Sequence, residues 1–150
     1  MSSFPLYLLR HGEPEGAGRL IGLTDAPPIA AGIAACADQA RNLAAEVLIA
    51  SDLSRARLAG EAIALATGVP LSIDPRWREL DFGAWDGMAP GDVEGAALAR
   101  FWDDPDGHAP PGGERWSALV ERVSSALGDL AARPTLIVTH GGAMRAALAV

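Results

Sequence analysis

The sequence of 150 residues contains no lysine, a single cysteine, Cys36, and no long uninterrupted apolar run. One cysteine excludes an intrachain disulfide and a metal cage built from thiolates, and it fits a reducing compartment. The N-terminus has no cationic lead before its short apolar run, and no segment reaches the roughly 18 apolar residues of a membrane span. These absences predict a soluble cytoplasmic protein.

Positive charge is also scarce, since 12 arginines stand against 19 acidic residues and the net charge is −7. A protein that binds nucleic acid or an anionic membrane through general electrostatics needs a basic face. The composition therefore predicts no nucleic-acid partner and no membrane partner. An anionic small molecule would have to be drawn by a local cluster of arginines.

The chain has the length and the apolar content of one compact domain, with 49% hydrophobic and 21% charged residues. Short apolar runs bounded by turn residues alternate with stretches of helical spacing. We predict strands, most of them buried on both faces, and helices between them. The strands are expected at 4–10, 47–51, 70–74 and 134–140, and the helices at 32–46, 53–67 and 113–132. This alternation predicts a single α/β domain over residues 1–150 with a largely parallel sheet.

Ligands of a parallel sheet collect beyond the carboxyl ends of its strands. The residues at those ends are Arg10-His11-Gly12 after the first strand, Ser51-Asp52 and then Arg55 after the second, and Thr139-His140-Gly141-Gly142 after the last. Two histidines and one or more arginines thus converge, without a lysine, cysteine or serine nucleophile in a plausible motif. That combination of side chains suits a phosphoryl group.

The chemistry of phosphoryl transfer explains why. Catalysis consists mostly of positioning and of electrostatic clamping of the equatorial oxygens, which arginine forks supply. A neutral imidazole can attack phosphorus in line and store the group as phosphohistidine until water removes it. Gly12 and the pair Gly141-Gly142 would let backbone N–H groups and a helix N-terminus approach the anion. A carboxylic acid near the pocket can protonate the leaving alkoxide.

Four ordered motifs carry a resemblance to a known family: "LRHGE" at 9–13, "SDLSRARLAGEAIA" at 51–64, "RELDFGAWDG" at 78–87 and "VTHGG" at 138–142. Together they resemble the histidine phosphatase superfamily, also called phosphoglycerate mutase-like. The resemblance implies a three-layer αβα fold and chemistry without a metal or another cofactor. It also implies His11 as the phosphorylated nucleophile, Glu79 as the proton donor, His140 as the second pocket histidine, and Arg10 and Arg55 as phosphate-binding arginines.

Within this family, "RELDFGAWDG" and "PPGGE" are more similar to α-ribazole phosphatases and broad phosphomonoesterases than to the glycolytic mutases. Pro14 and the following "EGAG" stand where the family usually has a threonine and a phosphate-contacting asparagine. The sequence ends ten residues after His140, so we expect an abbreviated sheet, and the segment 141–150 is a hypothesised homodimer contact.

Several alternatives stay open on the sequence alone. Asp81 or Asp86 could supply the proton in place of Glu79, and of the four tryptophans only Trp85 is expected near the site. The main interpretation is a phosphatase that acts on small phosphomonoesters. The alternatives are a mutase of the same family, a non-catalytic relative that binds phosphorylated ligands, and a metal hydrolase using His11, Glu13 and His140.

Overall fold

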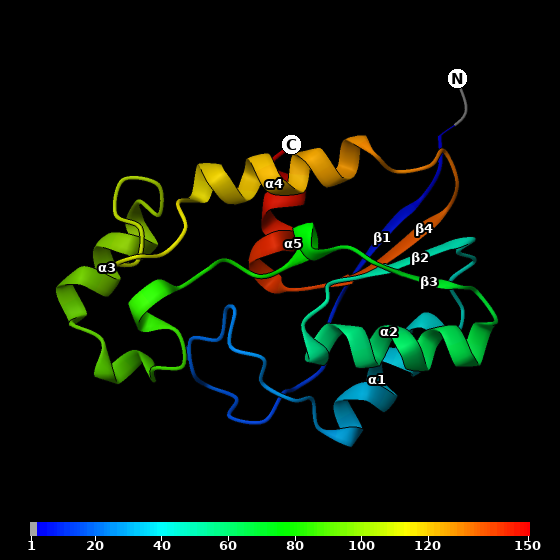
Figure 1. Ribbon diagram of the computed structural model, residues 1–150, viewed down its shortest axis with the longest axis horizontal. Helices are drawn as coiled ribbons and strands as arrows, with labels where there is room; N and C mark the ends of the chain where they lie inside the picture. The colour runs from blue at the N-terminus through cyan, green and yellow to red at the C-terminus, as the bar shows by residue number, and fades with distance from the viewer. Residues whose placement is uncertain (1–2) are drawn as a thin grey trace.

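The computed structural model describes residues 3–150 and shows a three-layer αβα arrangement (Figure 1). The central sheet is parallel, with the strand order β1-β4-β2-β3. Its strands are β1 (Leu6–Arg10), β2 (Val47–Ala50), β3 (Leu71–Ile73) and β4 (Thr135–Thr139). Helices α1 (Ala30–Ala40) and α2 (Ser54–Thr67) cover one face, and α4 (Trp116–Gly128) and α5 (Gly141–Leu148) cover the other. The predicted α/β class and parallel sheet are confirmed.

Each face of the sheet has its own hydrophobic core. On one face, small residues of α2 such as Ala56 and Ala59 let the helix approach Leu48 and Val138 of the sheet closely. On the other face, Leu119, Val123 and Ala126 of α4 are buried. Their spacing of four and three residues puts them on one side of the helix, which explains why α4 packs flat against this layer.

Burial of the strands differs from the prediction at the edges of the sheet. All five residues of β4 are buried, because β4 has a strand on each side and helices on both faces. The prediction of strands buried on both faces is wrong for β1 and β3, which lie at the edges, and Leu6 and Ile73 there are 41% and 43% exposed. An edge strand has only one neighbour to cover it.

The helices also differ in detail from the predicted ranges. The helix expected at 32–46 begins two residues earlier and ends at Ala40, and two short helices lie outside the predicted helical ranges: α3 (Gly95–Asp103) and α5. The first two residues of α5 are Gly141 and Gly142, where a helix N-terminus was expected although glycine has a low helix propensity. Three 3-10 turns lie at Pro75–Trp77, Gly83–Trp85 and Pro90–Asp92.

The segment between the second of these turns and α4 extends away from the sheet and carries α3 (Figure 1). Within residues 3–150, none of the helices combines the length and the apolar character that crossing a bilayer requires.

In α5, Ala143 and Ala146 pack into the core whereas Leu148 is 81% exposed. The homodimer contact suggested for residues 141–150 stays a prediction, which the molar mass in solution would test.

Candidate active site

His11 follows directly from β1 and continues its pairing, because its backbone N–H donates to the carbonyl of Thr139 at 3.0 Å. Its ring nitrogen Nδ1 lies 2.7 Å from the carbonyl oxygen of Gly12. A carbonyl can only accept, so Nδ1 carries the proton and Nε2 keeps a lone pair. The hydrogen bond to Gly12 therefore fixes the imidazole in the tautomer that can act as a nucleophile through Nε2.

The surroundings of His11 also keep the ring neutral. Burial lowers its pKa to about 4, and the positive charges of Arg55 and Arg10 act in the same direction, whereas the hydrogen bond to Gly12 raises it. The net effect of these causes leaves the imidazole unprotonated at neutral pH. A nitrogen lone pair is thus available without removal of a proton.

His140 lies at the end of β4, as the N-cap residue of α5, and is fully buried. Its ring centroid is 5.0 Å from that of His11. His140 Nε2 lies 2.9 Å from Ser51 Oγ, and among residues 3–150 its Nδ1 has no hydrogen-bond partner. Burial, followed by the charge of Arg55, lowers the pKa of His140 well below its usual value. A second neutral imidazole with an unused nitrogen therefore stands beside the first.

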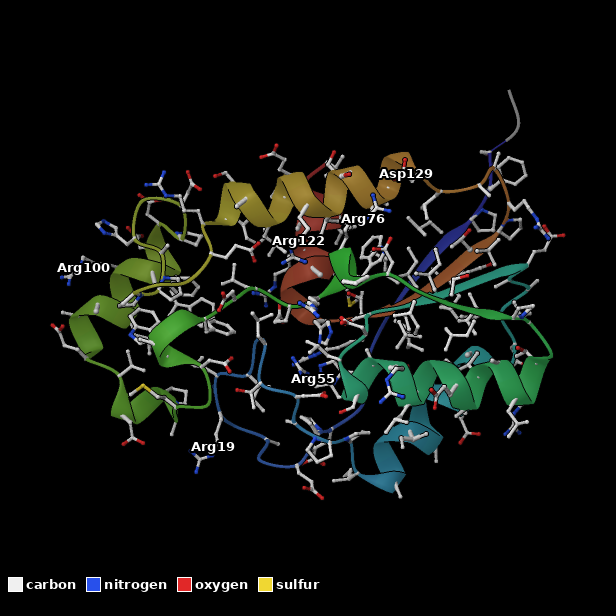
Figure 2. The ribbon with its side chains drawn as sticks, viewed as in Figure 1. Arg19, Arg55, Arg76, Arg100, Arg122 and Asp129 are labelled. Atoms are coloured by element: carbon white, nitrogen blue, oxygen red, sulfur yellow. The ribbon has the colours of Figure 1, made fainter. Side chains whose placement is uncertain are left out.

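Arg55, on the first turn of α2, is 1% exposed and lies at the centre of the molecule (Figure 2). Its guanidinium donates to the carbonyls of Thr24 at 2.8 Å and Gly22 at 2.7 Å. Within residues 3–150 no carboxylate forms an ion pair with it. The backbone thus fixes a buried positive charge, on which the carboxylates of Glu79, Asp25 and Asp86 act through their charge without forming an ion pair. Burial lowers the pKa of Arg55, and an anion placed beside it would be strongly attracted.

Arg10 approaches the same place from the end of β1 and is exposed. A Cβ atom added at Gly141 would lie 3.7 Å from its Nε, so the start of α5 runs directly beside the guanidinium. Gly12, the other glycine predicted near the phosphate, packs against the backbone of α1. A side chain on Gly12 would overlap the carbonyl group of Gly32. Gly12 therefore permits a close approach of two backbones beside His11.

Glu79 is the carboxylate that the fold brings to this group. Its oxygens accept hydrogen bonds from the backbone N–H groups of Leu80 at 2.8 Å and Gly142 at 3.1 Å. The alternatives named from the sequence lie elsewhere, since Asp81 accepts from the N–H of Gly83 and Asp86 binds the loop that precedes α1. Of these three carboxylates, only Glu79 lines the cavity next to His11.

The segment that carries Glu79 is held by residues that the sequence alone did not single out. Arg122 of α4 donates to the carbonyls of Arg76 at 2.8 Å and Arg78 at 2.9 Å, and it pairs with Glu114 at 2.8 Å. The Thr139 hydroxyl donates to the carbonyl of Trp77 at 2.6 Å. Figure 2 shows Arg122 extending from α4 toward this segment.

A usable signal for Arg122 was present in the sequence. It falls at the same helical spacing as the apolar residues Leu119, Val123 and Ala126, three positions after the first of them. An arginine on the apolar stripe of a helix needs buried acceptors. The carbonyls of the 76–79 segment and the Glu114 carboxylate provide them.

Two adjoining cavities open at this edge of the sheet. The first has a volume of about 350 Å³ and is lined by Arg10, His11, Gly12, Arg55 and Glu79, among others. His140 lies behind His11 rather than on the cavity surface. The predicted residues from four separate motifs are thus brought together. Within residues 3–150 no group of three or more His, Cys, Asp or Glu side chains could hold a metal ion.

The second cavity has a volume of about 410 Å³ and shares Arg10, Arg19, Ile21 and Glu79 with the first. Trp102 and Trp116 line it. The expectation that only Trp85 would lie near the site is not met, because Trp85 is buried in the core, where its ring packs edge-on against Phe101 at 5.8 Å.

Comparison with known proteins agrees with this geometry. The family described as "Histidine phosphatase superfamily (branch 1)" matches residues 6–150. A curated relative named "Probable phosphoglycerate mutase GpmB", from Enterobacter sp. (strain 638), is 35% identical over 152 residues, which cover 93% of this chain and 70% of the relative.

Two solved structures show the likeness in three dimensions. TTHB049 from Thermus thermophilus is 39% identical with a TM-score of 0.77, covering 94% of this chain and 80% of that one. The mycobacterial glucosyl-3-phosphoglycerate phosphatase Rv2419c is 28% identical with a TM-score of 0.82, covering 96% of this chain and 77% of that one. From the matched family, the fold and the convergence of the four motifs, we conclude that this chain belongs to branch 1 of the histidine phosphatase superfamily.

Proposed function

We propose that this protein hydrolyses small-molecule phosphomonoesters without a metal ion, through a phosphohistidine intermediate on His11. The observation that carries the proposal is the hydrogen bond from Nδ1 of His11 to the Gly12 carbonyl. It leaves a neutral Nε2 lone pair beside a cavity whose three arginines, Arg10, Arg19 and Arg55, have no carboxylate partner among residues 3–150. This arrangement attracts a phosphate group and offers it a nucleophile.

In the first step, Nε2 of His11 attacks phosphorus and the bond from phosphorus to the ester oxygen breaks. Arg10 and Arg55 balance the negative charge on the equatorial oxygens. The carboxylic acid of Glu79 donates its proton to the departing alkoxide, which leaves as an alcohol. The products of this half-reaction are the alcohol, N-phosphorylated His11 and the Glu79 carboxylate.

In the second step, water attacks the phosphorus of phosphohistidine while the Glu79 carboxylate accepts one of its protons. The bond from phosphorus to Nε2 breaks, inorganic phosphate forms, and His11 returns to its neutral state. Glu79 then holds the proton it gave up, so that the cycle closes. The backbone N–H bonds from Leu80 and Gly142 keep its carboxyl group in one place through both steps.

His140 is assigned the role of stabilising the transferred phosphoryl group from its buried position behind His11. Ser51 Oγ accepts from the N–H of Leu53 at 3.2 Å and can donate its own proton to Nε2 of His140. In that case the proton of the neutral ring resides on Nδ1, the nitrogen without a protein partner. Ser51 is therefore proposed as a positioning residue that orients the ring of His140.

A second candidate function is phosphoryl transfer between two positions of a phosphorylated sugar acid, as the name of the mutase-type relative suggests for that protein. It uses the same first step and differs only in the acceptor, which is the bound alcohol instead of water. Analysis of the products from 3-phosphoglycerate separates the two. Release of inorganic phosphate supports hydrolysis, whereas formation of 2-phosphoglycerate without phosphate release supports the mutase.

Hydrolysis of p-nitrophenyl phosphate between pH 4 and 8 with excess chelator tests the leading proposal. The wild type should turn over, and His11→Ala should lose at least about a thousandfold in kcat, because the covalent route is removed. His108→Ala, in an exposed loop outside both cavities, serves as the control. Acid-labile labelling of the wild type by a radioactive phosphate ester, absent from His11→Ala, would identify the intermediate. Undiminished turnover by His11→Ala would refute the proposal.

A further inference from the structure

We propose that the second cavity binds the leaving group, and that the preferred leaving group joins a flat apolar ring to a second anionic group. This inference rests on the proposed function, because it assigns the alcohol part of the same phosphomonoester. The first support for this inference is the position of the second cavity beside the first. Glu79, the proton donor to the leaving oxygen, and Arg10 line both cavities. Glu79 also lines a third cavity of about 330 Å³, but that cavity shares no other residue with the first. An ester oxygen within reach of both Glu79 and Arg10 therefore has its phosphorus in the first cavity and its carbon chain in the second.

The walls of the second cavity favour a flat apolar group. Phe82, Phe101, Trp102 and Trp116 line it together with Leu20 and Leu80. Trp102 is 57% exposed, although its ring packs against Phe101 with 4.9 Å between centroids. A flat apolar ligand that covers this exposed indole buries apolar surface of both partners, which favours binding.

The charge of this region favours an anion in addition to the phosphoryl group. Six of the 12 arginines pair with carboxylates, namely Arg41, Arg57, Arg76, Arg78, Arg122 and Arg133. Of the six without such a pair among residues 3–150, four line the two cavities: Arg10, Arg19, Arg55 and Arg145. In a protein of net charge −7, this concentration of unpaired arginines is a local exception.

Of these four arginines, Arg145 is the one that lines only the second cavity, away from the proposed position of the phosphoryl group. It lies on α5, four residues after Gly141 and three after Gly142, so all three share one side of the helix and line the second cavity. It does not line the first cavity. Arg145 is thus placed to pair with an anionic substituent on the leaving group, such as a carboxylate.

Two aryl phosphates of opposite charge test this inference: 4-(carboxymethyl)phenyl phosphate and 4-(aminomethyl)phenyl phosphate. A methylene group separates the charge from the ring in both, which limits its effect on the leaving oxygen. The wild type should prefer the carboxymethyl ester by about fivefold or more in kcat/KM, the size expected for a solvent-accessible charge pair. Arg145→Gln should reduce this preference to near unity. Arg100→Gln, on the outer side of α3 (Figure 2) and outside both cavities, should retain it.

A second variant tests the apolar wall. Trp102→Ala should raise KM by about fivefold for both aryl esters, as expected for loss of an aromatic contact, and should raise it less for ethyl phosphate, which has no ring. An equal preference for both charges in the wild type, or an unchanged preference in Arg145→Gln, would overturn the inference. An equal effect of Trp102→Ala on ethyl phosphate would overturn the apolar part.

Binding of the corresponding non-hydrolysable benzylphosphonates, measured by calorimetry, separates this inference from the proposed function. If no ester is hydrolysed but the carboxymethyl benzylphosphonate binds more tightly than the aminomethyl one and Arg145→Gln removes the difference, the catalytic proposal fails and the leaving-group site stands. If ethyl phosphate and both aryl esters are hydrolysed without discrimination by charge, the catalytic proposal stands and the leaving-group site fails.

Discussion

Asp86 holds the backbone of Gly22, whose N–H donates to the Asp86 carboxylate at 2.5 Å. The same carboxylate accepts from the N–H of Thr24 at 2.9 Å. The carbonyls of Gly22 and Thr24 in turn accept the hydrogen bonds of the Arg55 guanidinium. Asp86 therefore orients Arg55 through two backbone groups without touching it.

Replacing Asp86 by Asn tests this indirect role. The amide provides one acceptor oxygen instead of two, so the loop loses part of its support and Arg55 shifts relative to the first cavity. We expect affinity for inorganic phosphate to fall by about tenfold and the free energy of unfolding to fall by about 1–2 kcal/mol. Titration calorimetry well below the unfolding temperature measures the first quantity.

The matched control is Asp92→Asn, an exposed aspartate that makes no side-chain hydrogen bond within residues 3–150. It should leave phosphate affinity unchanged. A stability loss in Asp86→Asn without any loss of phosphate affinity would show that Asp86 supports the fold alone.

Gly142→Ala should damage catalysis through Glu79. A methyl group at residue 142 would overlap the Oε1 atom of Glu79, which forces the carboxyl group away from its present position. We expect kcat to fall by about tenfold or more, in line with the sensitivity of catalysis to small displacements. Gly128→Ala at the end of α4 is the control, since an added Cβ there meets nothing within 4 Å. Equal activity of the two variants would contradict the placement of Glu79.

Arg122→Met should expose the role of the segment that precedes Glu79. The variant removes the donors to the Arg76 and Arg78 carbonyls and leaves Glu114 half-buried without its partner. We expect a loss of about 2–3 kcal/mol in the free energy of unfolding. Because the proposed proton donor Glu79 becomes less well positioned, hydrolysis of esters with poor leaving groups should suffer most.

The readout is the ratio of kcat for ethyl phosphate to kcat for p-nitrophenyl phosphate, since the nitrophenolate leaves readily without a proton. Glu79→Gln should lower this ratio, and Arg122→Met should lower it in the same direction by a smaller factor. If Arg122→Met reduces both rates equally, Arg122 contributes to stability and does not position the proton donor.

The stability of the protein should decrease in mildly acidic solution. The pKa of His11 is about 4 in the folded protein against 6.5 as its usual value, so between these pH values the unfolded chain binds more protons. The free energy of unfolding is therefore highest above pH 6.5 and falls as the pH drops toward 4. The lowered pKa of His140 acts in the same direction.

His11→Asn removes the contribution of one histidine, so its thermal midpoint should fall less steeply between pH 6.5 and 4 than that of the wild type. Above pH 7 the two proteins should differ by a constant amount, which provides the internal control. Parallel curves across the whole range would mean that burial does not suppress protonation of His11.

The sequence was informative where one local signal decided the outcome. The four strands, the parallel sheet and the convergence of Arg10, His11, Arg55, Glu79 and His140 at one edge were all predicted from apolar runs, strand ends and motif resemblance, and the structure brings these residues together. The roles assigned to them stay proposals.

Other features depend on contacts between distant residues, which no local signal encodes. The bond from Thr139 to the Trp77 carbonyl joins residues 62 positions apart, and the pair of Asp86 and Gly22 spans 64 positions. The sequence also did not indicate that Trp102 is exposed whereas Trp85 is buried. Both rings pack against Phe101, yet of the two only Trp102 lines the second cavity.

The place of β4 between β1 and β2 also has a consequence for how the protein folds. Before β4 inserts, β1 has no strand to pair with, and His11 is separated from His140 by nearly the whole chain. Contacts between residues so far apart close slowly, because a long loop must first lose its freedom. Regain of enzymatic activity during refolding should therefore report the insertion of the central strand, and it should lag behind helix formation measured by circular dichroism.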